Sequence, residues 1–216
     1  MTKIRGVTAK MKVLLINGSP HEKGCTYTAL AEVAGTLEKH GIETEIFWVG
    51  TAPLSGCMGC GGCVKKGSCV FGDKVNEAAA KLDDADGIVV GSPVHYAAAS
   101  GQITSFLDRL FYSSGAKLVL KPGAAVVSCR RGGASAAFDQ LNKYFTINNM
   151  PVVSSQYWNQ VHGSNPEEVK RDEEGMQTMR TLGENMAWLL SSIEAGKNAG
   201  IKKPVYEQKI RTSFIR

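Results

Sequence analysis

A short, mostly apolar run near the start of the chain constrains the fold most. Residues 11–17 read MKVLLIN, the glycine-bearing loop GSPHEKGCT follows at once, and apolar residues then recur at helical spacing at Leu30, Val33, Ala34 and Leu37. Such a run is typical of a strand buried on both faces of a parallel sheet. A strand, a loop and a helix in this order form the repeating unit of alternating α/β proteins.

The same alternation continues along the chain. We expect further strands at 43–49, 87–90, 124–128 and 152–154, and helices at 26–40, 73–83, 105–112, 138–145 and 166–193. The fold class is therefore α/β, a three-layer α/β/α sandwich with a five-stranded, parallel, doubly wound sheet. Ligands of such sheets bind at the carboxyl ends of the strands. Loops 18–26, 92–100 and 129–135 are expected to meet there.

Length and charge limit the domain organisation and the partners. With 216 residues and 43% hydrophobic content, the chain is expected to form one domain at 11–195, an N-terminal extension at 1–10 and a basic tail at 196–216, so any second ligand shares the first one's site. The net charge of +5 lies mostly at the two ends, which argues against a nucleic-acid partner. No stretch is long enough to cross a membrane, and clustered cysteines fit a reducing, cytoplasmic compartment.

Four cysteines lie within thirteen residues, at Cys57, Cys60, Cys63 and Cys69. The first three are spaced so that they can surround one face of a cube-shaped cluster, and the glycines between them permit a tight backbone, as in a ferredoxin run. A structural zinc site more often has two Cys-x-x-Cys pairs far apart. A bound iron–sulfur cluster is the leading interpretation; zinc, a dithiol or disulfide pair, and an unmetallated loop remain open.

The loop at 18–26 is suited to a phosphate group. It directs backbone amides and the positive end of a helix at one spot, but it matches neither the Walker loop nor the G-x-G-x-x-G fingerprint. The hydroxyls of Ser19 and Thr26, the amides around Cys25, and His21 can hold a terminal monophosphate such as that of FMN. The alternative is structural, with Ser19 in a turn and Thr26 as a helix cap.

Two further loops offer groups for a flat ring. Pro93, Val94, His95 and Tyr96 leave the third strand with an imidazole and a phenol side by side. The third loop contributes donors and positive charge that favour a reduced, anionic flavin or bind a nicotinamide nucleotide phosphate, from Ser128, Arg130, Arg131, Gly132 and Gly133. The structural alternatives are closure of the strand end by His95 and Tyr96, and solvation of the arginines. Cys129 is expected to be inert packing.

The segments VLLINGSP and GSPVHYAAASGQITSFLDRL, with the four-cysteine loop between them, resemble the NADPH-dependent FMN reductase group of flavodoxin-like proteins, and within it the iron–sulfur flavoproteins. The resemblance implies an FMN phosphate site at Ser19, His21, Cys25, Thr26 and Tyr27, and an isoalloxazine site at 93–96. It also implies a 4Fe–4S cluster on the four cysteines, NAD(P)H as donor, and a homodimer or homotetramer. Relatives often carry arginine at the position of His21 and asparagine at that of Cys25.

The function expected from these features is an FMN-dependent oxidoreductase. It passes electrons between NAD(P)H or a reduced carrier and a small-molecule or protein acceptor, with a 4Fe–4S cluster on the loop at 51–70. The flavin carries the chemistry, so no side chain is assigned a catalytic role. Two alternatives are an FMN-only NAD(P)H:flavin or quinone reductase with unmetallated cysteines, and a non-catalytic electron carrier.

Overall fold

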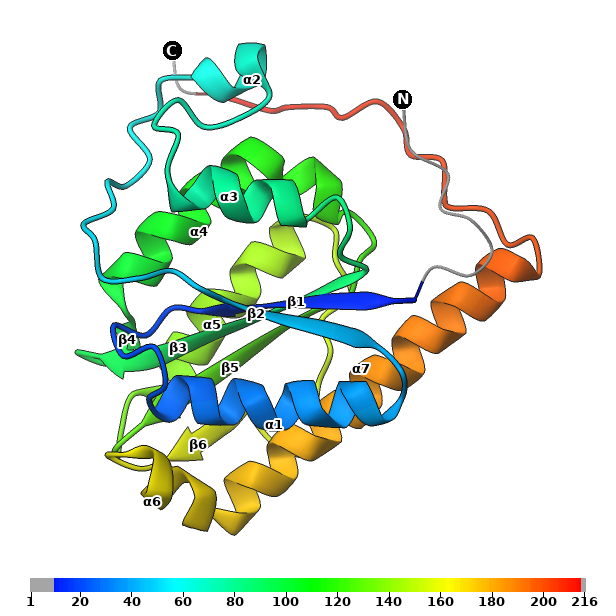
Figure 1. Ribbon diagram of the computed structural model, residues 1–216. Coiled ribbons are helices and arrows are strands. Elements are labelled where there is room, and N and C mark those ends of the chain that lie inside the picture. Colours follow the sequence, from blue (N-terminus) through cyan, green and yellow to red (C-terminus); the bar gives the residue numbers. More distant parts are fainter. Residues whose placement is uncertain (1–9, 215–216) are drawn as a thin grey trace.

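The computed structural model describes residues 10–214, and its core is a parallel sheet (Figure 1). Five strands lie in the order β2-β1-β3-β5-β6, and the short antiparallel β4 pairs with the end of β3. Their bounds are β1 (Lys12–Asn17), β2 (Glu43–Trp48), β3 (Gly87–His95), β4 (Ala98–Ala99), β5 (Gly123–Cys129) and β6 (Gln160–His162). The winding reverses between β1 and β3, which confirms the predicted doubly wound architecture.

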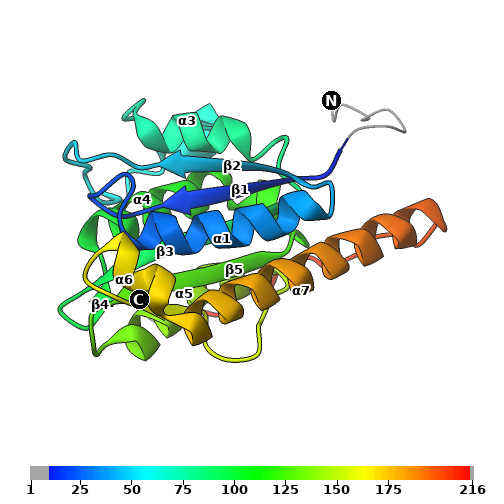
Figure 2. The ribbon, with the colours of Figure 1, turned by 60° about the horizontal axis from the view of Figure 1, so that its bottom comes forward.

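Helices cover both faces of the sheet (Figures 1 and 2). One core layer packs the sheet against α3 (Lys74–Lys81), α4 (Gly101–Ser114) and α5 (Ala134–Ile147), and the other packs it against α1 (Cys25–Lys39) and α7 (Glu173–Asn198). The remaining short helices are α2 (Gly62–Lys66), the 3-10 helix η1 (Gly115–Leu118) and α6 (Pro166–Arg171). The molecule therefore has three layers and two apolar cores.

The first strand shows why its four central residues, 13–16, are all apolar. Val13 and Leu15 face the core beneath α1 and α7, whereas Leu14 and Ile16 face the core beneath α3 and α4. Successive side chains of a strand point to opposite faces, so a strand between two helix layers needs apolar residues at every position. Central β1 is buried on both faces for this reason.

The fifth strand was predicted at 152–154, and this prediction is wrong in position. Residues 151–153 pair with β5 only around Gly123, through hydrogen bonds of 2.8 and 2.9 Å and one isolated bridge. The chain then leaves the sheet and returns as β6, eight residues later. Buried Asn159 holds the returning chain against β5. Its side-chain Nδ2 donates to Ala125 O (3.0 Å), and its backbone carbonyl accepts from Val127 N (2.9 Å).

The last helix was predicted as one element over 166–193, but the chain forms two, α6 and α7. The break lies at Asp172, whose backbone is non-helical (φ −75°, ψ 79°). Its carboxylate accepts from Gly175 N (3.0 Å), which caps α7, and from His162 N (2.6 Å), which ties the break to β6. The two hydrogen bonds to the Asp172 carboxylate thus stabilise the break between α6 and α7.

Other elements extend beyond their predicted bounds. The third strand continues through His95 and forms a hairpin with β4, so most of 91–100 is not a loop. The helices expected at 105–112 and 138–145 begin earlier, at Gly101 and Ala134. The predicted extension at 1–10 lies, except for Lys10, outside the described residues. Over the part of the chain that the structure describes, no helix combines the length and the apolarity needed to cross a membrane.

Candidate functional site

Three loops meet at the carboxyl edge of the sheet, beside the point where the winding reverses. Gly18 N donates to Gly91 O (2.9 Å), and the Ser100 hydroxyl donates to Gly18 O (3.0 Å). Gly133 lies against the hairpin, since a Cβ there would come within 2.6 Å of the Ala97 Cα. The structure thus places loop 18–24, the hairpin segment 93–100 and loop 130–133 in direct contact.

The loop after β1 is held in shape by its own side chains. The fully buried Asn17 donates from Nδ2 to Glu22 O (2.8 Å) and accepts from Ser19 N at Oδ1 (3.1 Å). Ser19 Oγ in turn accepts from His21 N (3.1 Å), and Trp48 Nε1 donates to Ser19 O (2.8 Å). These bonds fix the shape of the loop, and Asn17, which sequence reasoning did not single out, makes two of them.

In the part of the chain that the structure describes, no side-chain hydrogen bond caps the start of α1, the helix that follows this loop. Its N-cap is Gly24, so the first amides of α1 stay available to an anion at the positive helix end. His21 is exposed beside this end, and Cys25 and Tyr27 are half-buried in its first turn. The arrangement fits a phosphate group held mainly by backbone amides.

Thr26 and Ser128, two predicted cofactor residues, lie inside the protein. Thr26 Oγ1 is 2.8 Å from Ser128 Oγ, and both residues are buried. This bond joins the first turn of α1 to the end of β5 beneath the loops. Their role in this structure is to hold the two carboxyl-edge segments together.

The predicted ring-binding loop is a tight hairpin turn. Tyr96 (φ 49°) and Ala97 (φ 61°) both have left-handed backbones, which two-residue hairpin turns require but which tyrosine and alanine rarely adopt. Tyr96 is fully exposed and His95 is exposed, so neither covers the core, while Pro93 and Val94 are half-buried. The turn presents an imidazole and a phenol at the rim of the crevice.

The third loop contributes positive charge next to this turn. Arg130, Arg131 and Gly132 are exposed, and Gly133 adopts φ +90° where it meets the hairpin. Cys129 is buried, its Sγ lies 3.4 Å from His162 Nδ1, and burial raises the pKa of its thiol. A thiol in this environment is poorly reactive, as expected for packing.

The four-cysteine loop lies elsewhere, along the outer side of α4 (Figure 1). Gln102 Nε2 donates to Gly50 O (2.6 Å) and Arg109 Nη1 to Ser55 O (3.3 Å), which fastens the loop to that helix. Arg109 is eight residues into α4, about 12 Å along its axis from the carboxyl edge of the sheet. The two candidate sites are thus separate within one chain.

All four cysteines of the loop line one small cavity, together with Met58, Phe71 and Tyr112. Cys57 and Cys60 are exposed, Cys63 is half-buried and Cys69 is buried, and all are free thiols. Among residues 10–214 the structure has no group of three acidic, histidine or cysteine side chains already arranged around a metal position. The donor set and the shared cavity fit an iron–sulfur cluster by their chemistry, whereas the sulfur positions are not converged on one.

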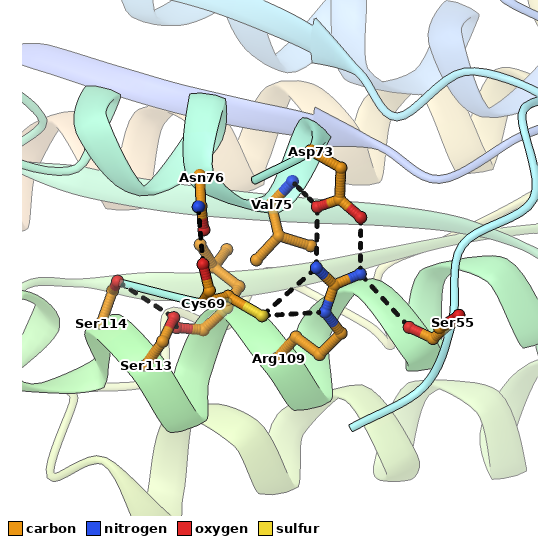
Figure 3. A network of polar contacts seen from close by, with 9 residues as sticks. Ser55, Cys69, Asp73, Val75, Asn76, Arg109, Ser113 and Ser114 are labelled. Carbon is orange, nitrogen blue, oxygen red and sulfur yellow. Dashed lines mark hydrogen bonds and ion pairs between the residues drawn. The ribbon is translucent and has the colours of Figure 1, made fainter. Parts of the chain in front are cut away.

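Arg109 is the functional candidate that the sequence analysis missed. Its guanidinium is buried, pairs with the Asp73 carboxylate through two bonds of 2.8 Å, and donates to Cys69 Sγ from Nε and Nη2 at 3.3 Å each (Figure 3). Asn76 Nδ2 also donates to Cys69 O (2.8 Å). The detectable signal was an arginine among the apolar residues of SFLDRLFY, where a solvated side chain is not expected.

The fold and these sites define a doubly wound α/β protein with a candidate phosphate site at the carboxyl edge of its sheet and a separate cysteine-lined cavity. A family model described as NADPH-dependent FMN reductase matches residues 11–164. The chain is 34% identical over 192 residues to an iron–sulfur flavoprotein of Methanocaldococcus jannaschii, covering 85% of this chain and 100% of that protein. It is 31% identical over 193 residues to an iron–sulfur flavoprotein of Archaeoglobus fulgidus (83% and 97% covered).

The fold is also shared with solved structures. One is an NAD(P)H:quinone oxidoreductase from Methanothermobacter marburgensis, with a TM-score of 0.63 at 15% identity, covering 82% of this chain and 96% of that one. At this identity the likeness shows the fold alone. The family match and the curated relatives decide the classification: the chain belongs to the NADPH-dependent FMN reductase family of flavodoxin-like proteins, in its iron–sulfur flavoprotein subgroup. It is a flavoprotein oxidoreductase by that membership.

Proposed function

We propose that the chain binds FMN at the carboxyl edge and a 4Fe–4S cluster on the four-cysteine loop, and that it passes electrons between NAD(P)H or a reduced carrier and an acceptor. The uncapped start of α1, facing a loop already shaped by Asn17 and Ser19, is the observation that carries the FMN assignment. The cavity shared by Cys57, Cys60, Cys63 and Cys69 supports the cluster.

The residues divide the binding of FMN between them. The amides at the start of α1 and the side chain of His21 would hold the phosphate, with Ser19, Cys25 and Tyr27 around it. Pro93, Val94, His95 and Tyr96 would contact the ring from the hairpin, and Gly132 and Gly133 would approach it with their backbone. When bound, FMN supplies the ability to accept two electrons together and release them singly.

The donor would use the same crevice. The chain has no second nucleotide-binding fold in its described part, and Tyr96, Arg130 and Arg131 stand exposed at the rim. An exposed phenol and two guanidinium groups suit a stacked nicotinamide and its phosphates. In this proposal Arg131 binds the donor phosphate or favours a reduced, anionic flavin.

Cys60→Ser tests the ligand assignment. In anaerobically purified protein we expect flavin bands on a broad blue-region absorption and about four irons per chain. The variant is expected to lose the iron and the broad absorption while it keeps its FMN. The proposed FMN site lies near the start of α4, whereas the cysteine cavity lies further along that helix, at Arg109. Cys129→Ser is the matched control, since that thiol lies outside the loop, and it should keep both groups.

Two other outcomes would redirect the proposal. Iron retained in Cys60→Ser would contradict the ligand assignment. FMN without iron in the unaltered protein would leave an FMN-only NAD(P)H reductase with unmetallated cysteines. Anaerobic mixing with NADPH or NADH separates an enzyme from an electron carrier, since only an enzyme would show prompt bleaching of the flavin.

A further inference from the structure

Cys69 differs from the other three cysteines of the loop. It is buried, and its Sγ accepts two N–H groups from Arg109, Nε and Nη2, at 3.3 Å each. Its carbonyl accepts from Asn76 Nδ2 at 2.8 Å. Both the sulfur and the backbone of this one cysteine are therefore held in place by other parts of the chain.

The guanidinium of Arg109 is shared between both ends of the loop and the start of α3 (Figure 3). Nη1 donates to the carbonyl of Ser55, which precedes the first cysteine of the loop. The opposite edge of the guanidinium faces Cys69, the last cysteine of the loop. Asp73, the N-cap of α3, binds the guanidinium with both carboxylate oxygens. Phe71 covers the guanidinium with its ring, 4.6 Å from centroid to Cζ.

We propose that Arg109 is a positioning residue that sets the reduction potential of the group held by the four cysteines, through its two hydrogen bonds to Cys69. The inference rests on the proposed function, because it takes the loop to hold a cluster. Adding one electron makes that group one unit more negative, and donors aimed at a thiolate sulfur favour the more negative state. Arg109 therefore raises the potential.

Asp73 opposes this effect from the other side of the guanidinium. The pair is nearly neutral as a unit, but the cationic partner is the one in contact with sulfur. Neutralising Asp73 leaves the positive charge of Arg109 uncompensated, whereas neutralising Arg109 leaves a carboxylate near the cysteine. In a poorly hydrated position such charges act strongly. The two changes are thus expected to shift the potential in opposite directions.

The experiment is a redox titration of the cluster, followed by electron paramagnetic resonance, in anaerobically prepared protein. Arg109→Gln is expected to lower the midpoint potential and Asp73→Asn to raise it, while asparagine still caps α3. A tenfold change in the reduction equilibrium appears as a shift of about 59 mV for one electron. Lys117→Met is the matched control, because it breaks a similar but more exposed ion pair with Asp83 and should leave the potential unchanged.

A structural role alone would give a different result. Shifts of the same sign in both variants, or no shift with iron retained, would overturn the inference. Unaltered protein without iron would overturn the proposed cluster, and with it this inference, so the two failures are distinguishable. If Arg109→Gln does not fold, the upward shift in Asp73→Asn still decides the question.

Discussion

At the scale of single residues, the crevice depends on backbone conformations that few side chains tolerate. Tyr96 and Ala97 occupy the left-handed region in the hairpin turn, at a cost of about 1–2 kcal/mol each. Gly133 stands against Ala97 with no room for a Cβ. Strain of this kind persists only where surrounding contacts impose it, and it commonly marks functional sites.

Gly133→Ala is therefore expected to destabilise the protein and weaken FMN binding. The new Cβ would meet Ala97 Cα at 2.6 Å and Val94 Cγ1 at 2.9 Å, with the backbone at φ +90°. We expect a loss of about 2 kcal/mol or more in the free energy of unfolding, measured by urea titration, and a higher Kd for FMN. Gly132→Ala is the control for the free energy of unfolding, since a Cβ there meets nothing within 4 Å. Equal effects in the two variants would contradict the packing argument.

At the scale of elements, α4 connects the two candidate sites. Ser100 caps its start by accepting from Ile103 N (3.3 Å), and the same hydroxyl donates to Gly18 O in the phosphate loop. Two turns later Arg109 reaches the cysteine cavity. A rigid helix thus sets the separation between the FMN crevice and the proposed cluster. This explains why the four-cysteine loop is fastened to α4 at Gln102 as well as at Arg109.

The start of α1 gives a prediction about pH. Burial raises the pKa of the Cys25 thiol, the acidic start of α6 at Glu168 and Glu167 adds to this, and a local backbone hydrogen bond opposes it. A raised pKa means less thiolate at neutral pH, so alkylation of Cys25 should be slow near pH 7 and keep accelerating above the ordinary thiol range of about 8.5. Peptide mass spectrometry of FMN-free protein measures the rate.

Bound FMN is expected to slow this alkylation further, because its phosphate would lie against the same helix end. Glu168→Gln is a matched variant that removes one raising influence, so it should move the pH profile of the Cys25 rate downward. A rate that reaches its plateau below pH 8 would contradict the burial of the thiol. Absence of protection by FMN would remove Cys25 from the proposed phosphate site.

At the scale of the whole molecule, α7 and the tail carry large apolar side chains that are exposed. Trp188 on α7 is 72% exposed, and Val205, Ile210 and Phe214 on the tail are 86–98% exposed. Ile201, which is 71% exposed, lines a cavity with Leu190 near the end of α7. Large apolar side chains left in water mark surfaces that bind other chains. A homodimer or homotetramer built through these residues stays a prediction.

Deleting residues 204–216 is expected to lower the oligomeric state, while the protein keeps its FMN. The cut keeps 201–203, which line the cavity at the end of α7, so the domain core is preserved. Light scattering coupled to gel filtration measures the mass, and a full-length variant with Val205, Ile210 and Phe214 changed to serine separates apolar contact from chain length. An unchanged mass in both proteins would show that the tail takes no part in assembly.

Local sequence was sufficient for the features that depend on near neighbours. The apolar run of β1, the helical spacing of α1 and the order of alternating elements follow from which faces must be buried, so the doubly wound sheet was predictable. The meeting of the loops after β1, β3 and β5 followed from that topology. The family resemblance rested on the same segments.

Only the tertiary structure decided the features that depend on distant partners. Val152 and Val153 read as a strand, yet the edge of the sheet is β6, because buried Asn159 bonds to β5. Arg109 is a charged residue within an apolar segment, yet its partners were not predictable, because Cys69 of the cysteine loop and Asp73 at the start of α3 meet it only in the folded chain. Propensity and periodicity encode what a segment prefers, whereas the choice among long-range hydrogen-bond partners is made when the segments pack together.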